Sequence, residues 1–447
     1  MPDSAAPARR CAYVVLRRVF EGGAYADRAF AAEAADLDAR DRALAMRLTY
    51  GAVQRKGTLD HLIERLAERP AGALDAPVLA ALRLGLYELL YLRGAPDYAV
   101  VADAVELAKA NARGGHGLVN AVLRRAAREG ADALLGALGE DTPARAAVKH
   151  SHPEWIARLW WQELGPEDAC ALMATDNEPW ELALRANTLV IDAPSLAGHL
   201  PVRTHLDPAI PEAVVLEEAF DAHRSKLWGD GAFLAQSRAA MLVARTLDPE
   251  PGERVLDLCA APGGKSTHLA ALMSGRGLVV AVERDRRRAG ALVRTAQRLH
   301  ATNVRVELAD AERWGSQHGP GRTSGASAGE PPFDRVLVDP PCSGLGTLAA
   351  RADLRWRMTP DTVAQLAATQ ARILAAGARA LRPGGVLVYS TCTISPTENE
   401  RLIAAFLDSH PEFAPDGPGG VDRPGVLSTL PHRDHTAGFF IARMRRS

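Results

Sequence analysis

The sequence RVLDLCAAPGGKST, residues 254–267, leads from an apolar strand through a glycine turn into the start of a helix. Val255, Leu256 and Leu258 have the apolar character of a buried strand, and Pro262–Gly264 interrupt it. In an α/β sheet, such a junction places backbone N–H groups and the positive end of a helix at the carboxyl edge of the strand, where ligands bind. The stretch therefore predicts a binding site for an anionic or polar group.

The end of this turn, Gly264–Ser266, invites comparison with a phosphate-binding P-loop. That motif needs a glycine where this chain has Cys259, and Pro262 removes a backbone N–H from a loop that works by donating them. A nucleoside without a triphosphate fits better, because Glu283 ends the next apolar run, Leu278–Val282, about 20 residues beyond the glycines. At that offset a carboxylate accepts hydrogen bonds from ribose hydroxyls. A P-loop ATPase remains an alternative.

Length and charge limit the class of protein. A chain of 447 residues predicts two or three domains. A formal net charge of −1 provides no global field that would attract a polyanion, so any nucleic-acid surface must be local. Candidate arginine clusters, each of which is also typical of a solvated helix face, are Arg284–Arg288, Arg124–Arg128 and the group of Arg351, Arg355 and Arg357.

The cysteines and the apolar runs indicate the compartment. Five cysteines, an odd number without regular spacing, argue against a disulfide framework and favour a reducing environment. No CxxC or Cys/His pair has the spacing of zinc ligands, so no metal is expected. The N-terminal sequence lacks the apolar core of a signal peptide, and no apolar run reaches the roughly 18 residues of a membrane span. We therefore expect a soluble, cytoplasmic protein without a membrane partner.

Apolar periodicity divides the chain into three expected domains. Residues 1–145 show only helical patterns and predict an all-α domain. Residues 146–230 carry mixed signals, including a strand fragment at Leu189–Ile191, and predict a small α+β connector. Residues 231–447 alternate short apolar runs with helical segments. This alternation predicts an α/β Rossmann-like domain with a mostly parallel, doubly wound sheet.

Six apolar runs are expected to form strands of this sheet. The last of them is expected to lie at an edge, and the Gly/Ser/Pro-rich segment Trp314–Pro332 is expected to be a surface loop. The expected strands are Arg254–Leu258, Leu278–Val282, Val304–Leu308, Arg335–Val338, Val386–Tyr389 and Phe439–Met444.

Polar side chains follow the ends of three of these strands. Asp310 follows the third strand, where a carboxylate can meet an adenine amino group. Asp339 follows the fourth and shares the proline-stiffened stretch DPPCSGLG with Cys342, and Cys392 follows the fifth in YSTCTIS. Because the carboxyl ends of parallel strands meet at one edge of a sheet, we expect these groups to converge. Two cysteines beside a nucleoside pocket favour a chemical role over packing.

Two thiols, a carboxylate and a nucleoside cofactor are the groups that methylation of cytosine at carbon 5 requires. Carbon 5 is a poor nucleophile until a thiolate adds to carbon 6 and makes an enamine, which takes a methyl group from a sulfonium donor. A carboxyl group hydrogen-bonded at ring nitrogen 3 stabilises the charge that builds there. A second thiol can help remove the carbon 5 proton and release the covalent adduct.

The motifs that carry these residues resemble a known family. LDLCAAPGGK, DPPCSGLG and STCTISPTENE look like the motifs of RNA cytosine-5 methyltransferases that use S-adenosylmethionine. In the N-terminal half, LRLGLYELLYL, AVELAK and GLVNAVLRR are similar to the NusB-like domain of the bacterial Fmu/Sun family, the ribosomal RNA small subunit methyltransferase B type. The resemblance covers nearly the whole chain, including the closing GFFIARM.

The resemblance implies a role for each site residue. Cys392 would be the nucleophile, Cys342 would assist release, and Asp339 would lie between the cofactor and the target base. Glu283 would hold the ribose hydroxyls, and Asp310 would lie at the adenine. The turn that would wrap the methionine and ribose portions of S-adenosylmethionine consists of Cys259, Ala260, Ala261, Pro262, Gly263, Gly264 and Lys265.

The resemblance also implies a substrate and leaves alternatives. The all-α domain would bind RNA and direct a monomeric enzyme to a cytosine of 16S ribosomal RNA. Four positions depart from the common family pattern: Ser237 and Glu283 stand where aspartate is common, Thr393 where serine is, and Thr397 where glutamate is. A transfer RNA cytosine-5 methyltransferase and a non-catalytic RNA-binding factor for antitermination or ribosome assembly remain alternatives.

Overall fold

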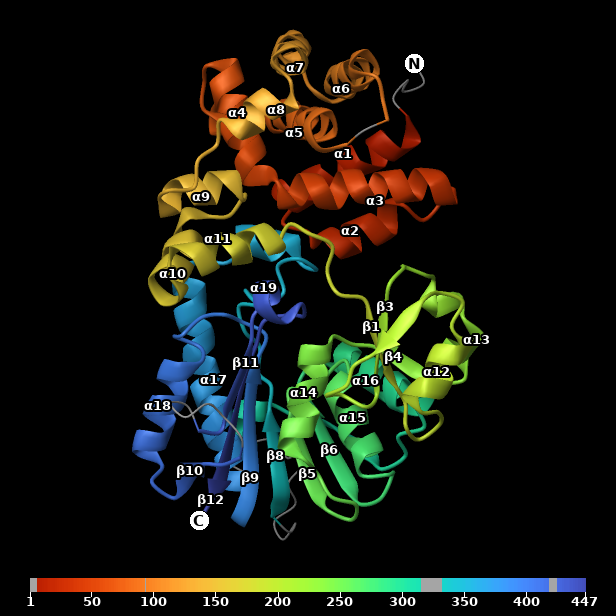
Figure 1. Ribbon diagram of the computed structural model, residues 1–447, viewed down its shortest axis with the longest axis vertical. Helices are drawn as coiled ribbons and strands as arrows, with labels where there is room; N and C mark the ends of the chain where they lie inside the picture. Colours follow the sequence, from red (N-terminus) through yellow and green to blue (C-terminus); the bar gives the residue numbers. More distant parts are fainter. Residues whose placement is uncertain (1–5, 93, 315–331, 418–423) are drawn as a thin grey trace. The chain divides into compact units, whose positions relative to one another are not determined.

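The computed structural model describes residues 6–92, 94–314, 332–417 and 424–447 (Figure 1). Contacts divide the chain into two compact units. The first comprises Met1–Glu178 with Leu348–Arg357, and the second comprises Pro179–Thr347 with Met358–Ser447. This division differs from the expected boundaries after residues 145 and 230, so the three-domain division stays a prediction.

The first unit is helical, as its sequence predicts. Side chains at the expected helical spacing, such as Leu59, Leu62 and Ile63, are fully buried in one apolar core. The helices α10 and α11, which fall in the expected connector, pack against α9 and against each other in this unit. The helices are α1 Pro7–Phe20, α2 Ala26–Glu33, α3 Ala39–Gln54, α4 Lys56–Ala67, α5 Ala76–Tyr91, α6 Asp97–Asn111, α7 His116–Glu129, α8 Ala131–Gly136, α9 Pro143–Lys149, α10 Glu154–Leu164 and α11 Pro166–Thr175, with short 3-10 turns η1 Ala71–Ala73 and η4 Ala352–Trp356.

The segment Leu348–Arg357 joins this helical unit although it follows the DPPCSGLG stretch in sequence. Arg355 is fully buried and donates to the backbone oxygens of Ser151 and Asp176. Trp356 Nε1 donates to Val53 O at 2.8 Å. The suggestion that Arg355 belongs to a solvated or RNA-binding arginine cluster is therefore wrong, because its guanidinium satisfies buried carbonyls.

The second unit begins with a small antiparallel sheet in the strand order β2-β3-β1-β4. The predicted strand at Leu189–Ile191 is wrong, because Val190 N and Ile191 N both donate to Asn187 O and close a turn. The elements here are β1 Ala183–Ala186, α12 Ala193–His199, β2 Thr204–Leu206, β3 Ala213–Leu216, η2 Ala222–Arg224, α13 Lys226–Gly229 and β4 Phe233–Ala235.

An eight-stranded sheet forms the rest of the second unit. Its order is β10-β12-β9-β8-β5-β6-β7, with β11 also paired to β12, and the five strands from β9 to β7 are parallel. The elements are α14 Arg238–Leu247, β5 Arg254–Leu258, α15 Gly264–Leu272, β6 Leu278–Glu283, α16 Arg286–Arg298, β7 Val304–Leu308, η3 Ala311–Arg313, β8 Phe333–Val338, α17 Pro360–Ala380, β9 Leu381–Thr391, α18 Glu400–Ser409, β10 Phe413–Pro415, β11 Val426–Thr429, α19 Pro431–Asp434 and β12 Phe439–Arg446.

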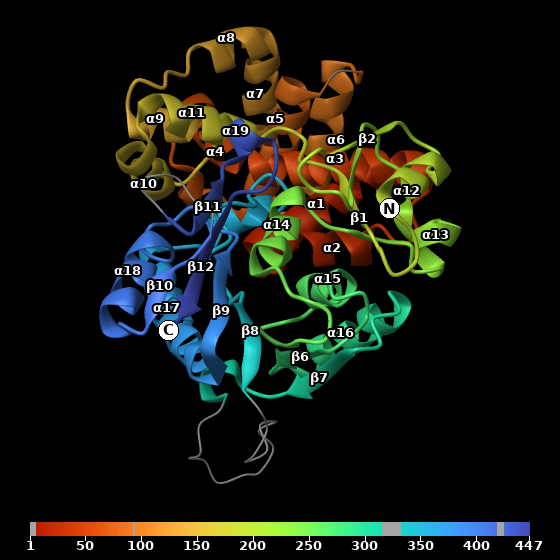
Figure 2. The same cartoon turned by 60° about the horizontal axis from the view of Figure 1, so that its bottom comes forward.

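Helices cover both faces of this sheet, as Figure 2 shows for the two sides of β8 and β9. Alternate residues of a strand point to opposite faces, so Leu256 packs in the core under α17 and α18, while Val255 packs in the core under α14 and α15. Strands buried on both faces explain the continuous apolar runs of the sequence. The prediction of an all-α region followed by a Rossmann-like domain with a mostly parallel, doubly wound sheet is confirmed.

Two local expectations need correction. The strand at Phe439–Met444 is not at an edge, because β12 pairs with β9 on one side and with β10 and β11 on the other. The short, proline-containing β10 takes the edge instead. In the expected loop Trp314–Pro332, Trp314 is a buried core residue, and residues 315–331 lie outside the described residues.

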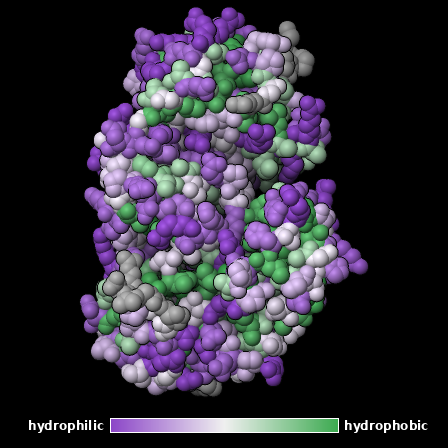
Figure 3. All heavy atoms as spheres, in the orientation of Figure 1, coloured by the Kyte–Doolittle hydropathy of each residue, from purple (hydrophilic) through white to green (hydrophobic). Residues whose placement is uncertain are grey.

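The surface view in Figure 3 shows hydrophilic side chains spread over the whole face, between scattered hydrophobic patches. Among the described helices, none is both long enough and apolar enough to cross a membrane.

Candidate functional site

The glycine turn lies between β5 and α15, where the sequence predicts it. Cys259 has φ +69° and Gly263 has φ +105°. The backbone angle of Gly263 favours glycine, and a Cβ there would lie 2.6 Å from Leu292 Cδ1 and force that side chain to shift. Thr267 Oγ1 donates to Gly263 O at 2.7 Å and fixes the first turn of the helix. The N-terminus of α15 thus stands at the carboxyl end of β5.

Glu283 and Asp310 follow the next two strands and lie at the same sheet edge. Glu283 ends β6, is 3% exposed, and its Oε1 accepts a hydrogen bond from Asp285 N at 2.8 Å. Ala309 N donates to Glu283 O at 3.1 Å, which brings the two strand ends side by side. Asp310 Oδ1 accepts from Glu312 N at 3.1 Å and caps a short 3-10 turn. The expected ribose and adenine carboxylates are therefore neighbours.

Asp339 lies at the end of β8 and contacts a cation from the glycine turn. Lys265 Nζ is 2.6 Å from Asp339 Oδ2, and Ser390 Oγ donates to Asp339 Oδ1 at 2.8 Å. Burial lowers the pKa of Lys265, but the charge and hydrogen bond of Asp339, together with the nearby Cys392 and Asp257, raise this pKa overall. The lysine is charged at neutral pH and holds the Asp339 carboxylate in place.

The two predicted thiols lie together. Cys342 Sγ is 3.4 Å from Cys392 Sγ, and Gly346 N donates to Cys392 O at 3.0 Å, which joins the two loops through the backbone. The hydrogen bond to Cys392 and burial raise the pKa of the Cys342 thiol well above its usual range. Cys342 is therefore protonated at neutral pH, in position to donate toward the sulfur of Cys392.

Three contributors to this edge escaped the sequence interpretation. Arg185 of β1 is buried, and its guanidinium donates to Gly264 O at 2.5 Å and to Thr267 Oγ1 at 2.9 Å. The only signal in the sequence is that Arg185 directly follows the short apolar run Leu182–Leu184. Ser390 and Glu398 lie within the stretch YSTCTISPTENE, but the sequence does not show that they bind Asp339 and Ser343, respectively.

Ser237, one of the departures from the family pattern, has a clear local role. It is the N-cap of α14, and its Oγ accepts a hydrogen bond from Ala240 N at 3.3 Å. A serine performs this capping as well as an aspartate. The helix start therefore does not need the carboxylate.

The described residues contain one group of three potential metal donors, and it lies in the helical unit. Glu140, His150 and Cys170 place one ligand atom each within 4.8 Å of the others. Both carboxylate oxygens of Glu140 already have partners, because Oε2 is 2.6 Å from His150 Nε2 and Oε1 is 2.7 Å from Lys149 Nζ. The group is explained as a hydrogen-bonded cluster.

Comparisons with known proteins show the family of the chain. A family model described as 16S rRNA methyltransferase RsmB/F matches residues 244–445, and a NusB family model matches residues 6–128. A probable ribosomal RNA small subunit methyltransferase B from Synechocystis sp. is 36% identical over 98% of this chain and 99% of its own length. The ribosomal RNA small subunit methyltransferase B of Klebsiella pneumoniae is 34% identical over 91% of this chain and 90% of its own.

Solved structures show the same architecture. The crystal structure of PH0851 superposes with a TM-score of 0.79 at 26% identity and covers 99% of both chains. A methyltransferase homologue from Pyrococcus horikoshii, 28% identical, covers 69% of this chain and 99% of its own, with a TM-score of 0.59. With full-length relatives at this identity, the chain belongs to the RsmB/F family of S-adenosylmethionine-dependent rRNA methyltransferases.

Proposed function

We propose that this protein methylates carbon 5 of a cytosine in 16S ribosomal RNA through a covalent adduct on Cys392, with Cys342 assisting release. The observation that carries the proposal is the 3.4 Å separation of the two sulfurs at the carboxyl edge of the sheet. One thiol is needed to add to the base, and the other is needed near it when the adduct is resolved.

The residues around the glycine turn fit S-adenosylmethionine. The N-terminus of α15 presents backbone N–H groups, and Glu283 presents a carboxylate at the end of β6, two strands from β8 and three from β9. Asp257 Oδ1 is buried without a hydrogen-bond partner in the described structure, which is typical of a site that a ligand completes. The turn Cys259–Lys265 would hold the methionine and ribose portions, Glu283 the ribose hydroxyls and Asp310 the adenine. When bound, the cofactor supplies an electrophilic methyl group.

The first chemical step belongs to Cys392. Its thiolate forms a bond from Sγ to carbon 6 of the cytosine, and the electron pair of the ring double bond moves to carbon 5. Asp339 lies near the end of the strand that leads to Cys392, because Ser390, two residues before Cys392, donates to it. Ring nitrogen 3 takes up the proton that the Cys392 thiol has given up, and the Asp339 carboxylate would accept a hydrogen bond from that N–H and stabilise the protonated ring. Carbon 5 would then take the methyl group that bound S-adenosylmethionine supplies.

Release needs a proton acceptor and a leaving group. A water molecule accepts the carbon 5 proton, the electron pair of that C–H bond restores the ring double bond, and the bond from Cys392 Sγ to carbon 6 breaks. The departing sulfur becomes a thiolate beside the protonated Cys342, whose thiol donates to it and stabilises it. This order of events assigns different roles to two cysteines that are otherwise close neighbours.

Support for the RNA target comes from the relatives rather than from the catalytic geometry. The matching family model is described as a 16S rRNA methyltransferase, and full-length relatives are named for the small subunit RNA. A NusB-like region precedes the catalytic unit in the same chain. We assign to that region the binding of RNA, and to the catalytic unit the methylation of a single cytosine.

The test is methyl transfer from labelled S-adenosylmethionine by the full-length protein. Naked 16S RNA, small-subunit particles and transfer RNA are offered separately, and digested RNA is analysed for 5-methylcytidine by mass spectrometry. We expect one modified cytosine in 16S RNA. Modification of transfer RNA alone would make the protein a transfer RNA enzyme, and RNA binding without transfer would favour an assembly or antitermination factor; either result overturns the proposal.

A further inference from the structure

The two catalytic cysteines lie on separate loops, which follow the neighbouring strands β8 and β9. We call these the thiol loops: Cys342–Gly346 after β8, and Cys392–Asn399 after β9. Residues 342 and 392 are 50 positions apart in sequence, yet their sulfurs are 3.4 Å apart. Something must fix the distance between loops that leave neighbouring strands, because a small shift in a reacting group lowers catalysis steeply.

A buried carboxylate, Glu398, connects the two loops. Its Oε1 accepts a hydrogen bond from Ser343 N at 2.9 Å, and its Oε2 accepts one from Ser343 Oγ at 2.5 Å. Ser343 Oγ also lies 2.6 Å from Thr393 Oγ1. Ser343 directly follows Cys342, and Thr393 directly follows Cys392. The Glu398 carboxylate therefore holds the neighbour of Cys342 directly, and the neighbour of Cys392 through the Ser343 hydroxyl.

A second layer fixes Glu398 itself. Gln370 of α17 donates from Nε2 to Glu398 Oε1 at 2.9 Å and to Pro341 O at 2.9 Å. Tyr389 Oη donates to Glu398 O at 2.7 Å. Asn399, the next residue, donates to Thr393 O at 2.9 Å. The carboxylate is thus bound on both sides and has no freedom to turn toward solvent.

Glu398 differs from most buried acids in that hydrogen bonds, and not a basic side chain of the described residues, balance its carboxylate. It is fully buried, and no ion pair neutralises it among the described residues. A buried carboxylate that relies on neutral donors is costly to maintain unless every hydrogen bond is made. All of the donors come from the thiol loops or from a side chain that also holds the residue before Cys342. The carboxylate's hydrogen bonds are therefore directed to these loops.

We propose that Glu398 is a positioning residue that fixes the distance between the nucleophilic and the releasing thiol. It does not touch the base or the cofactor, and it acts through Ser343 and Thr393. The assignment rests on the proposed roles of Cys342 and Cys392. It predicts that disturbing Glu398 slows chemistry without weakening the binding of either substrate.

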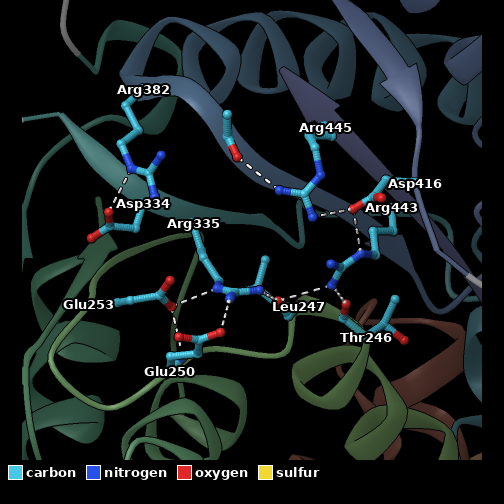
Figure 4. Close-up of polar contacts among 11 residues, drawn as sticks. Thr246, Leu247, Glu250, Glu253, Asp334, Arg335, Arg382, Asp416, Arg443 and Arg445 are labelled. Carbon is cyan, nitrogen blue, oxygen red and sulfur yellow. Dashed lines mark hydrogen bonds and ion pairs between the residues drawn. The ribbon is translucent and has the colours of Figure 1, made fainter. Parts of the chain in front are cut away.

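The test uses full-length Glu398→Ala, Glu398→Gln and Ser343→Ala. The control is Asp334→Ala, which removes a hydrogen-bonded carboxylate at the opposite end of β8 (Figure 4). Steady-state kinetics give kcat and the KM values for RNA and for S-adenosylmethionine. A second measurement adds diamide to the free enzyme: its azo bond takes two hydrogens, becomes a hydrazine, and leaves a disulfide between Cys342 and Cys392. Mass spectrometry of peptides follows the rate.

We expect Glu398→Ala to lower kcat about 100-fold with both KM values within about twofold. Disulfide formation should slow at least about fivefold, while Asp334→Ala leaves it unchanged. Glu398→Gln should recover most of both activities, because an amide oxygen can still accept from Ser343 N and Gln370. If Glu398→Ala does not fold, Ser343→Ala decides, since it removes only the hydroxyl that bridges Glu398 and Thr393.

Two results would overturn the assignment. One is that Ser343→Ala and Glu398→Ala form the disulfide between Cys342 and Cys392 at the wild-type rate. The other is equal loss of cross-linking in Asp334→Ala, which would mean general loosening of the unit. Because cross-linking needs no RNA and no methyl donor, slowed cross-linking in an enzyme that never methylates cytosine would support the positioning role and refute the proposed reaction.

Discussion

The two ends of strand β8 carry carboxylates in opposite conditions. At the amino end, Asp334 accepts from Arg254 N at 2.8 Å and from Arg382 Nε at 2.7 Å, and Arg335 Nε lies 2.6 Å from Glu253 Oε2 (Figure 4). Burial acts to raise the pKa of Asp334, but these hydrogen bonds and the arginine charge lower it overall. Asp334 and Glu253 each pair with an arginine of the protein, so this end contributes stability.

At the carboxyl end lie the polar groups that we assign to the binding of the cofactor and the base. Asp257, on the neighbouring β5, accepts from Ser266 Oγ at 2.6 Å, and no other side chain among the described residues donates to it. Burial raises its pKa to about 7. Cys342 is held as a neutral thiol, and Asp339 shares its carboxylate between Lys265 and a serine. The same strands thus have one end where carboxylates pair with arginines of the protein and another end that carries the proposed reactive groups. This asymmetry, rather than charge density, marks the functional edge.

The largest effect expected from this asymmetry concerns the nucleophile. Cys392→Ala should lower methyl transfer by about 10³-fold or more, because the enamine cannot form without the thiolate. Scintillation counting of labelled RNA measures it. Cys170→Ala, a partly buried thiol in the helical unit, is the matched control and should keep full activity. Transfer by Cys392→Ala at the wild-type rate would contradict the reactive role of this end.

The next effect separates the two thiols. Cys342→Ala should trap a covalent protein–RNA adduct, because Cys392 still adds to the base while its departure lacks a proton donor. A denaturing gel of enzyme with RNA and methyl donor should show a slow-migrating species. The double variant Cys342→Ala with Cys392→Ala should not show it. A gel without that species for the single variant would show that Cys342 has no part in release.

Much of this edge was predictable because it follows local rules. A glycine turn after an apolar strand, an acid about 20 residues later and polar residues at strand ends are set by backbone geometry and by the parallel sheet. The predicted positions of Gly263, Glu283 and Asp339 at one edge follow from those rules, as does the meeting of the two cysteine loops.

What escaped prediction depends on contacts between distant segments. The guanidinium of Arg185 reaches Gly264 across 79 positions of sequence, and Glu398 reaches Ser343 across 55. Arg355 was assigned to a surface cluster because its neighbours in sequence are arginines, whereas its burial is decided by helices near residues 151 and 176. Periodicity and motif spacing carry no information about which buried donor meets which acceptor.

The contrast between the two ends also predicts opposite responses to pH. Asp257 has a folded-state pKa of about 7, above its unfolded value near 4, so its folded form favours the neutral acid. Its contribution to stability is therefore greatest at low pH and is lost as the pH rises through about 4 to 7. The melting temperature of Asp257→Asn minus that of wild type should therefore be about 5 °C higher at pH 8 than at pH 5.

Asp334→Asn is the control for this measurement. Its folded-state pKa is lowered, so Asp334 is ionised in both states above pH 5, and its contribution is lost only as the pH falls below that range. The melting temperature of Asp334→Asn relative to wild type should thus stay constant from pH 5 to pH 8. Scanning calorimetry of the free protein gives both curves. A constant difference for Asp257→Asn as well would mean that this acid is ionised in the folded protein.

The smallest effect tests whether the amino end is purely structural. Asp334→Ala should lower the free energy of unfolding by about 1 kcal/mol, since its partner Arg382 is 43% exposed and water screens the pair. Urea denaturation at low and at high salt measures this, and the loss should shrink in high salt because mobile ions weaken exposed pairs. kcat should stay within about twofold of wild type, because the reactive end of the strand keeps all its contacts. A large fall in kcat at unchanged stability would mean that the two ends are coupled along β8, and the division between a stabilising and a reactive end would no longer hold.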